Sequence, residues 1–328
     1  MPLSYTTRTL TLPDDLSDVV DLLQQGECVA LPTETVFGLA ADASNPDAVA
    51  KIFSAKQRPT NHPLIVHISD IHQAERWVTQ VPDVAYQLAD AFWPGPLSLL
   101  MHKHPHINAS VTGGLDGIVL RAPNHPDFQA ILQASKLGLA APSANLYKSI
   151  SPTSANHVLK TLGGRIAAVV ETNTPPVCGI ESTILDIRCF PPKLLRPGPI
   201  SAAQISALLG VDVEVPLAHQ QVVPGNVTKH YQPQTPAHLC DEQVIHARVT
   251  NQVTDRIAWL VYSSEAQTLL GDYPDVRVLS SEPADYARDL YHALHELDGL
   301  GCAQIMIETP PQDSAWLAVN DRLRRACA

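Results

Sequence analysis

The chain has 328 residues, 45% of them hydrophobic and 17% charged, which is enough to bury a core and to form about two domains. Its 22 Lys and Arg residues against 33 Asp and Glu give a formal net charge of −11, which argues against a broad nucleic-acid-binding surface. No apolar run reaches about 18 residues, residues 1–12 lack a signal-peptide pattern and the six cysteines form no Cys-x-x-Cys pair, so we expect a cytoplasmic protein without a membrane span or a zinc site.

Short β-like runs alternate with helical patterns from residue 7 to about residue 210. The predicted strands are 7–12, 28–32, 63–68, 97–102, 117–123, 137–142, 167–172 and 182–187. The predicted helices are 14–26, 45–56, 83–92, 128–135, 154–162 and 201–210. Strands with helices between them predict an α/β domain over residues 1–210.

The pattern changes after residue 210. Residues 211–236 have little helical periodicity and contain four prolines, which predicts an ordered linker. Beyond it, the predicted strands are 258–263, 276–281 and 304–308, and the longest predicted helices are 283–297 and 315–328. We therefore expect a small, open, Rossmann-like α/β domain of three or four strands over residues 237–328.

Two cations stand close together in the segment KQRP. Pro59 biases Arg58 toward extended backbone, where residues two apart face the same side, so Lys56 and Arg58 are expected to form a two-pronged phosphate site. The alternative is a helix C-terminus, which favours lysine, followed by an exposed loop. These four residues alone leave both interpretations open.

Other polar residues also follow predicted strands, where open α/β sheets usually bind ligands. Thr33 and Thr35 flank Glu34 in one such turn, and Ser143 and Asn145 occupy another. An ordinary polar turn is the alternative for both. Ser151 opens a predicted helix start, where free N–H groups favour anions. Arg121, Ser182 and Arg196 each lie at a strand end, and a surface ion pair is the alternative for such an arginine.

Several of these segments together resemble a known family. PTETVFG, KQRPTNHPLIVHI, FWPGPLSLL, APSAN followed by SPT, GIESTILD and LLRPGPI occur in this order and are similar to the YrdC-like family. PGNVTKHYQP and the ending AVNDRLRRA further resemble its long, two-domain threonylcarbamoyl-AMP synthases. The resemblance covers nearly the whole chain and implies a YrdC-like twisted-sheet catalytic domain followed by the smaller α/β domain.

The resemblance also implies a reaction. Enzymes of this kind join L-threonine, bicarbonate and ATP into threonylcarbamoyl-AMP and pyrophosphate, the first step of threonylcarbamoyladenosine modification of tRNA. Mg²⁺ would arrive with ATP without dedicated protein ligands, and a downstream tRNA threonylcarbamoyl transferase complex would receive the product. No activated serine or cysteine nucleophile is needed, because the protein positions reactants and neutralises charge.

Site residues carry over from the resemblance position by position. Lys56 and Arg58 are the implied catalytic cations. The implied ATP contacts are Lys56, Arg58, His62, Ser143, Asn145, Ser151, Arg196, His230 and Tyr231, the last two as a lid within the linker. The implied L-threonine contacts are Thr35, His67, Arg121, Ala141 and Ser182. A strand-end histidine without a ligand role remains the alternative for His67.

The chain departs from the family pattern at several points. Phe37 replaces the usual Tyr, His62 replaces the usual Asn, the glycine between APSAN and SPT is missing, and residues 226–228 alter the linker. We expect activity with altered nucleotide affinity or lid motion. Two other functions stay open: a paralogue that carbamoylates another acceptor, which the intact threonine-side residues disfavour, and a non-catalytic RNA-binding or ribosome-maturation module, which the scarcity of Lys and Arg disfavours.

Overall fold

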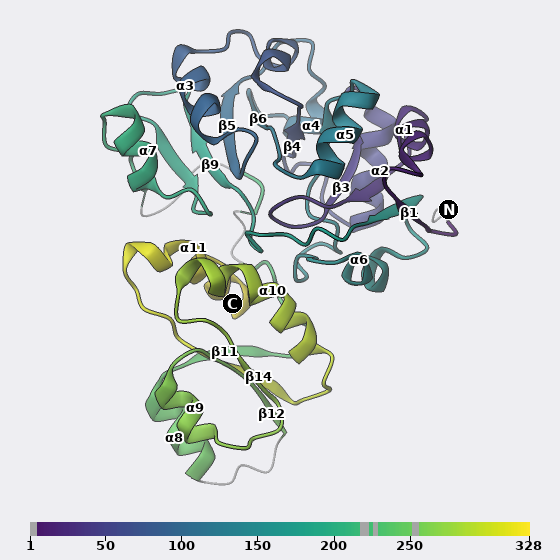
Figure 1. Cartoon of the computed structure of the whole chain (residues 1–328). Helices are drawn as coiled ribbons and strands as arrows, with labels where there is room; N and C mark the ends of the chain where they lie inside the picture. The colour runs from purple at the N-terminus through teal and green to yellow at the C-terminus, as the bar shows by residue number, and fades with distance from the viewer. Residues whose placement is uncertain (1–4, 217–222, 226–228, 251–255) are drawn as a thin grey trace. The chain divides into compact units, whose positions relative to one another are not determined.

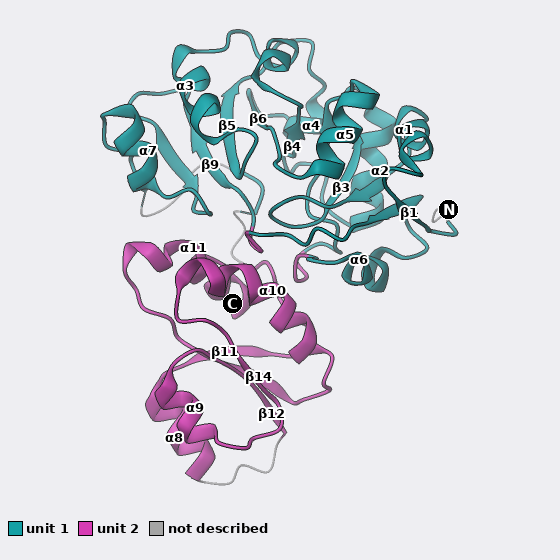
Figure 2. Cartoon of the chain, in the orientation of Figure 1, with its two compact units in different colours: residues 1–147, 152–177, 181–226 teal, residues 148–151, 178–180, 227–328 magenta. Residues whose placement is uncertain are grey.

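The computed structural model describes residues 5–216, 223–225, 229–250 and 256–328 (Figure 1). The chain divides into two compact units, coloured separately in Figure 2. Unit 1 comprises residues 1–147, 152–177 and 181–226, and unit 2 comprises 148–151, 178–180 and 227–328. The contiguous division expected from the sequence stays a prediction, and part of its linker, 211–236, lies outside the described residues.

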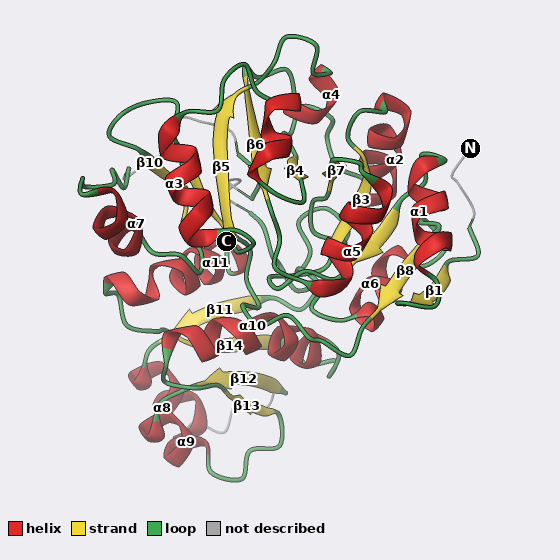
Figure 3. Ribbon diagram, turned by 45° about the horizontal axis from the view of Figure 1, so that its top comes forward, coloured by secondary structure: helices red, strands yellow, loops and turns green. Residues whose placement is uncertain are grey.

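Unit 1 is built on a mixed, ten-stranded sheet (yellow in Figure 3). Its strands are β1 (Arg8–Thr11), β2 (Val29–Leu31), β3 (Gly38–Asp42), β4 (Ile65–His67), β5 (Leu97–His102), β6 (Gly117–Arg121), β7 (Leu139–Ala140), β8 (Ala168–Glu171), β9 (Thr183–Asp186) and β10 (Lys193–Arg196). The order is β1-β8-β2-β3-β7-β4-β6-β5-β9-β10. Parallel pairs such as β4–β6 and β5–β9 alternate with antiparallel pairs such as β5–β6.

Helices connect these strands and begin at clear sequence signals. They are α1 (Leu16–Gln24), α2 (Pro46–Lys56), α3 (Asp83–Phe92), α4 (Ala109–Thr112), α5 (Pro126–Ser135), α6 (Ala155–Leu162), α7 (Ala202–Leu209) and the 3₁₀ helix η1 (Ile71–Arg76). Asn45 caps α2 by accepting hydrogen bonds from the N–H groups of Asp47 and Ala48. Ser201 and Gln204 form a capping box on α7.

The core of unit 1 forms because its strands are apolar on both faces. All residues of β2 and β6 are buried, and α1 and α5 supply Leu23 and Phe128 to the same cluster as Leu31. A second cluster is formed in part by side chains of β5 and β9, among them Leu100 and Ile184. Burial on both sides leaves the strand ends as the places where polar side chains from several strands can meet.

Unit 2 is a smaller α/β unit with a fully parallel sheet in the order β11-β14-β12-β13. Its elements are β11 (Ala237–Cys240), α8 (Glu242–Thr250), β12 (Ile257–Val261), α9 (Ser264–Leu270), β13 (Val276–Val278), α10 (Pro283–Asp298), β14 (Gln304–Glu308), η2 (Ser314–Trp316) and α11 (Leu317–Ala326). Helices α8 and α9 pack together on one face of the sheet, and α10 and α11 pack together on the other (Figure 1). The open, Rossmann-like arrangement with four strands is confirmed.

Most predicted elements of unit 1 appear within a few residues of their expected ends, and α3 and β5 have the predicted bounds. Two strands of unit 1, β3 and β10, are not among the predicted ranges, although Arg196 was expected at a strand end. GLAAD forms β3, which pairs antiparallel with both β2 and β7. Its small side chains carry neither strict alternation nor β-branching, and Gly38 weakens the strand signal further.

Candidate functional site

Lys56 is a fully enclosed cation whose ammonium is held by main-chain carbonyls. It is the last residue of α2 and is 1% exposed. Its Nζ donates a 2.6 Å hydrogen bond to the carbonyl of Asn145 and a second one to the carbonyl of Ser143. Burial and the neighbouring Arg58 lower the pKa of Lys56 well below its ordinary value, while Glu181 acts in the opposite direction. Burial and Arg58 therefore disfavour the positive charge of Lys56, and a bound anion would stabilise that charge.

Arg58 places a second buried cation beside it. Its Nη2 donates a 3.1 Å hydrogen bond to the carbonyl of Pro63, and its guanidinium carbon lies 6.0 Å from the ring centroid of Tyr147. The same ring meets the imidazole of His62 edge-on at 5.5 Å. Tyr147 was not among the predicted site residues, although only Leu146 separates it from APSAN. The structure thus brings together Lys56, Arg58, His62 and the APSAN turn.

The extended two-pronged geometry expected for Lys56 and Arg58 is wrong. Gln57 between them ends α2 in the left-handed conformation, with φ 54° and ψ 40°. Lys56 is therefore at a helix C-terminus, as the alternative interpretation held, and Arg58 lies beyond the turn. The same alternative also predicted an exposed loop after the helix, and this is wrong at Arg58 because Arg58 is buried. The two cations are nevertheless close enough for Arg58 to lower the pKa of Lys56, with Lys56 held by the APSAN loop and Arg58 beside Tyr147.

The TETVFG turn and the APSAN loop lie against each other through their backbones. Leu39 N–H donates to the Pro142 carbonyl at 2.7 Å, and Ala144 N–H donates to the Phe37 carbonyl at 2.8 Å. A Cβ on Gly38 would lie 3.2 Å from that of Ala141, so glycine permits this close approach. The two turns expected near a ligand are consequently one structural unit. Phe37 itself is buried.

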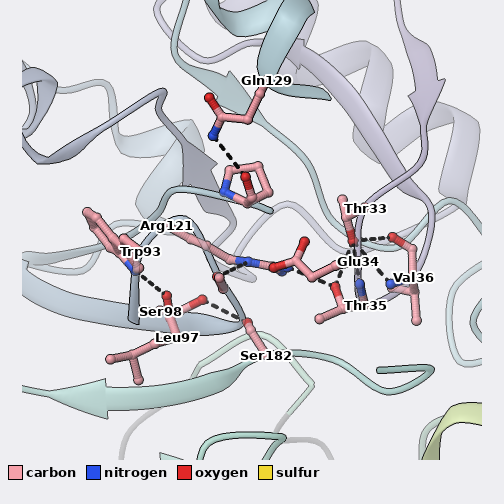
Figure 4. A network of polar contacts seen from close by, with 12 residues as sticks. Thr33, Glu34, Thr35, Val36, Trp93, Leu97, Ser98, Arg121, Gln129 and Ser182 are labelled. Atoms are coloured by element: carbon pink, nitrogen blue, oxygen red, sulfur yellow. Dashed lines mark hydrogen bonds and ion pairs between the residues drawn. The ribbon is translucent and has the colours of Figure 1, made fainter. Parts of the chain in front are cut away.

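Arg121 is the centre of a second polar cluster, drawn in Figure 4. It ends β6 and is 3% exposed. Its Nε donates to the Gly95 carbonyl at 3.2 Å and its Nη2 to Thr35 Oγ1 at 3.1 Å. Nη2 also lies 2.7 Å from Glu34 Oε1, which makes a buried ion pair. Two turns and one strand end thereby fix the guanidinium.

Thr33 holds the turn that carries Glu34 and Thr35. Its Oγ1 accepts from the N–H of Thr35 at 3.0 Å and from that of Val36 at 3.1 Å, and it lies 2.7 Å from Thr35 Oγ1 (Figure 4). The alternative of a threonine-capped turn is thus correct as local structure. The turn nevertheless delivers Thr35 to Arg121.

His67 stands opposite Arg121 in the register of β4 and β6. Its ring lies 5.3 Å from that of Phe128, and its Nδ1 has no hydrogen-bond partner among the described residues. Burial and then the charge of Arg121 lower the pKa of His67 from 6.5 to about 3. The imidazole is therefore neutral at physiological pH.

Ser182 and Arg196 form a third cluster. Arg196 donates from Nε to the Ser182 carbonyl at 2.9 Å and from Nη2 to Ser182 Oγ at 3.0 Å. Ser98 Oγ lies 2.7 Å from Ser182 Oγ (Figure 4), although Ser98 was not predicted as a site residue. Its signal was a single polar residue in the apolar run LSLLMH. Arg196, expected beside ATP, thus directly contacts Ser182, which was expected beside threonine.

Three predicted ATP contacts belong to unit 2. Ser151 is buried and its carbonyl lies 3.1 Å from His295 Nε2. It does not open a helix, because α6 begins at Ala155 with Ser154 as its N-cap. His230 and Tyr231 are buried with ring centroids 4.0 Å apart. Their lid role stays a prediction, and the altered linker positions 226–228 lie outside the described residues.

Tyr231 is fixed by the helices of unit 2. Its ring centroid lies 5.6 Å from that of Tyr291 on α10 and 5.4 Å from the guanidinium carbon of Arg322 on α11. Its φ of 62° is a left-handed value that a non-glycine residue adopts only when its surroundings impose it.

Within the described ranges, no group of three or more His, Cys, Asp or Glu side chains could hold a metal ion. No helix in the described part of the chain is long and apolar enough to cross a membrane.

Buried cations at the strand ends of a mixed sheet, followed by an all-parallel second unit, define a two-domain α/β protein with an anion-accepting site. Residues 21–198 match the family model Sua5_yciO_yrdC, described as "Telomere recombination". Residues 200–328 match the model Sua5_C, described as "Threonylcarbamoyl-AMP synthase, C-terminal domain". The chain belongs to the Sua5/YciO/YrdC family, in the two-domain form that carries the Sua5-type C-terminal domain.

Individual relatives are similar to this chain over nearly its whole length. The threonylcarbamoyl-AMP synthase of Bacillus subtilis is 38% identical over 98% of this chain and 95% of its own. That of Pyrococcus abyssi is 34% identical over 93% of this chain and 91% of its own. The crystal structure of P. abyssi Sua5 complexed with L-threonine superimposes with a TM-score of 0.88 at 31% identity, covering 98% of this chain and 97% of that one.

Proposed function

We propose that the protein is an L-threonylcarbamoyladenylate synthase, which converts L-threonine, bicarbonate and ATP into threonylcarbamoyl-AMP and pyrophosphate. The observation that supports this most strongly is the buried cation site of Lys56 and Arg58, closed by the carbonyls of Ser143 and Asn145. A desolvated lysine next to an arginine suits a polyphosphate, since both cations gain the counter-charge that burial denies them.

The reaction requires two balanced steps. Threonine's free amine adds to bicarbonate, which gives a carbamate and water. A carbamate oxygen then attacks the α-phosphorus of ATP, and the bond to the β-phosphate oxygen breaks to release pyrophosphate. Lys56 and Arg58 stabilise the charge on the phosphates, and the rigid APSAN loop positions Ser143 and Asn145 for the nucleotide.

Arg121 receives the carboxylate of threonine in this proposal. Its contacts with described residues use Nε and Nη2, so Nη1 is the donor that faces the ligand. Thr35 and Ser182 offer hydroxyl groups, and neutral His67 offers a ring nitrogen without a partner among the described residues. Such groups suit the threonine hydroxyl better than a charged neighbour would.

Mg²⁺ is the proposed companion of ATP. It usually keeps several waters and binds through one or two carboxylates together with substrate phosphates. In this proposal the ion is carried by the ATP phosphates and its own waters, without dedicated protein ligands. When bound, Mg²⁺ supplies further neutralisation of phosphate charge.

The proposal extends to location and partners. We place the enzyme in the cytoplasm, where a tRNA threonylcarbamoyl transferase complex would consume its product. Relatives that match the whole chain are named threonylcarbamoyl-AMP synthases, which favours this function over carbamoylation of another acceptor and over a non-catalytic RNA-binding role.

Pyrophosphate release provides the test. Purified protein should release pyrophosphate from ATP only when L-threonine and bicarbonate are both present, and mass spectrometry should detect threonylcarbamoyl-AMP. Equal release with L-serine, L-valine and L-alanine, or no release at all, would contradict the proposal. Arg58→Ala should reduce turnover at least 100-fold, whereas Arg165→Ala, at an arginine outside the three clusters, serves as the matched control.

A further inference from the structure

Glu34 is a buried carboxylate with unused hydrogen-bonding capacity. It is 4% exposed and lies at the tip of the turn that Thr33 holds in place. Oε1 lies 2.7 Å from Arg121 Nη2, but the approach is not aligned as a hydrogen bond. Neither carboxylate oxygen accepts a hydrogen bond from any described residue. A carboxylate has about four acceptor sites, so the ion pair alone leaves it under-satisfied.

A purely structural ion pair explains only part of this arrangement. Burying a carboxylate costs several kcal/mol unless hydrogen bonds compensate for lost hydration. The neighbouring Thr35 hydroxyl is no donor to Glu34, since its contacts run to Thr33 and Arg121. Glu34 therefore has the charge and the open acceptor positions that a cationic ligand group would use, beside the arginine proposed to take an anionic one.

Free L-threonine carries both charges on one carbon, an ammonium and a carboxylate. We infer that Glu34 receives the α-ammonium of threonine while Arg121 receives its carboxylate. This rests on the proposed function and adds a recognition residue to it. The charges of Arg121 and Glu34 are adjacent, as are the carboxylate and the ammonium of an α-amino acid. The pair can therefore bind both charged groups of one ligand.

The pairing gives the site a selection rule. A ligand with the threonine side chain and carboxylate but without the ammonium leaves Glu34 uncompensated, so it should bind more weakly. This role also accounts for the sequence TETV. Thr33 holds the backbone of the turn in place, and this fixes the direction of the Glu34 side chain (Figure 4). Glu34 is a recognition residue for threonine as it binds, and the proton that the ammonium must lose before the amine adds to bicarbonate passes to water.

The test compares two ligands on two proteins. Titration calorimetry should measure L-threonine and its 2-hydroxy analogue, 2,3-dihydroxybutanoate of matching stereochemistry, in which a hydroxyl replaces the α-ammonium, on the wild type and on Glu34→Gln. The wild type should prefer threonine at least tenfold. Glu34→Gln should lose at least tenfold in threonine affinity while its affinity for the analogue changes less than threefold. Glu27→Gln, at a glutamate paired with Lys51 2.8 Å away, should leave both affinities unchanged.

The outcomes separate this inference from the proposed function. If the wild type binds no threonine, the proposed function fails and the inference fails with it. If the wild type binds threonine but Glu34→Gln keeps the same preference, only the inference is overturned. ATP binding by Glu34→Gln reports whether the variant folds. If the variant does not fold, the wild-type measurements alone test the inference. A wild-type preference for threonine over the analogue of less than threefold shows that the ammonium is not recognised.

Discussion

The ammonium of Lys56 donates a 2.6 Å hydrogen bond to the main-chain carbonyl of Asn145, which ties the end of α2 to the loop that follows β7. The carbonyls supply partial negative charge but no full counter-charge, and Arg58 adds a second positive charge nearby. The pair is therefore held in place before any nucleotide arrives. Pre-formed charge of this kind reduces the reorganisation needed on binding.

ATP binding should take up a proton at pH values above the lowered pKa of free Lys56. The pKa of Lys56 is lowered in the free protein, and bound phosphate should raise it again. ATP affinity should consequently fall as the pH rises above the pKa of free Lys56, approaching tenfold per pH unit. Titration calorimetry over a series of pH values, in two buffers of different ionisation enthalpy, measures up to one proton per site.

Lys56→Arg provides the control for this proton uptake. Arginine stays charged throughout this pH range, so the variant should bind ATP with no proton uptake from this position, even if its affinity is lower. An identical uptake by the variant would assign the proton to another group.

The apolar pattern predicted most of the fold because it depends on local signals. The capped start of α2 at Asn45 and the mostly apolar run of β5 are both patterns of consecutive residues. The antiparallel strand β3 was missed because its small side chains give a weak strand signal and one of its two partners, β7, comes from a distant part of the chain. Pairing of that kind does not show in the sequence of the strand itself.

The candidate site was predicted by its residues and not by its geometry. Lys56 and Arg58 converge through a left-handed turn at Gln57, a conformation that glutamine rarely adopts and that no local signal announced. Ser98 and Tyr147 join the clusters through contacts with residues more than 80 positions away. Sequence spacing carries no information on such contacts, whereas the ordered motifs still located the right segments.

Acid should destabilise unit 1 through His67. Its pKa falls from 6.5 to about 3 on folding, so its stabilising contribution is complete above pH 6.5 and is lost as the pH falls toward 3. Between pH 7.5 and 5.0 the expected loss from this group is about 2 kcal/mol. Urea titrations monitored by hydrogen exchange in peptides spanning β4 and β6 report on unit 1 alone.

His67→Gln removes the titrating group and should flatten this pH dependence by about the same amount. His72→Gln, at an exposed histidine of η1, should keep the wild-type dependence. If His67→Gln and the wild type lose equal stability between the two pH values, the imidazole is not the group that titrates.

Gly198→Ala should disturb the cluster of Ser182 and Arg196. A Cβ at this position would lie 2.4 Å from the nitrogen of Thr183 and 2.7 Å from the carbonyl carbon of Ser182, both backbone atoms. Overpacking of this kind costs about 1–3 kcal/mol or more. The melting temperature should fall, and the KM for threonine should rise at least tenfold in the pyrophosphate assay.

Gly299→Ala is the matched control for Gly198→Ala. Its Cβ would meet nothing closer than the carbonyl oxygen of Glu296 at 3.3 Å, so the substitution should change the melting temperature little. A Gly198→Ala variant with wild-type KM and stability would show that the close approach at this turn has no bearing on the site.

Tyr147 should contribute to nucleotide affinity through its ring. The guanidinium of Arg58 lies 6.0 Å from the ring centroid, and the imidazole of His62 meets the ring at 5.5 Å. A cation–π contact of this kind is worth about 0.5–1 kcal/mol.

Tyr147→Leu should therefore weaken ATP binding roughly two- to fivefold, whereas Tyr147→Phe, which keeps the ring, should stay near the wild-type affinity. Titration calorimetry with ATP at pH 7.5 distinguishes them. Equal losses in both variants would point to the hydroxyl, and no loss in either would remove Tyr147 from the nucleotide site.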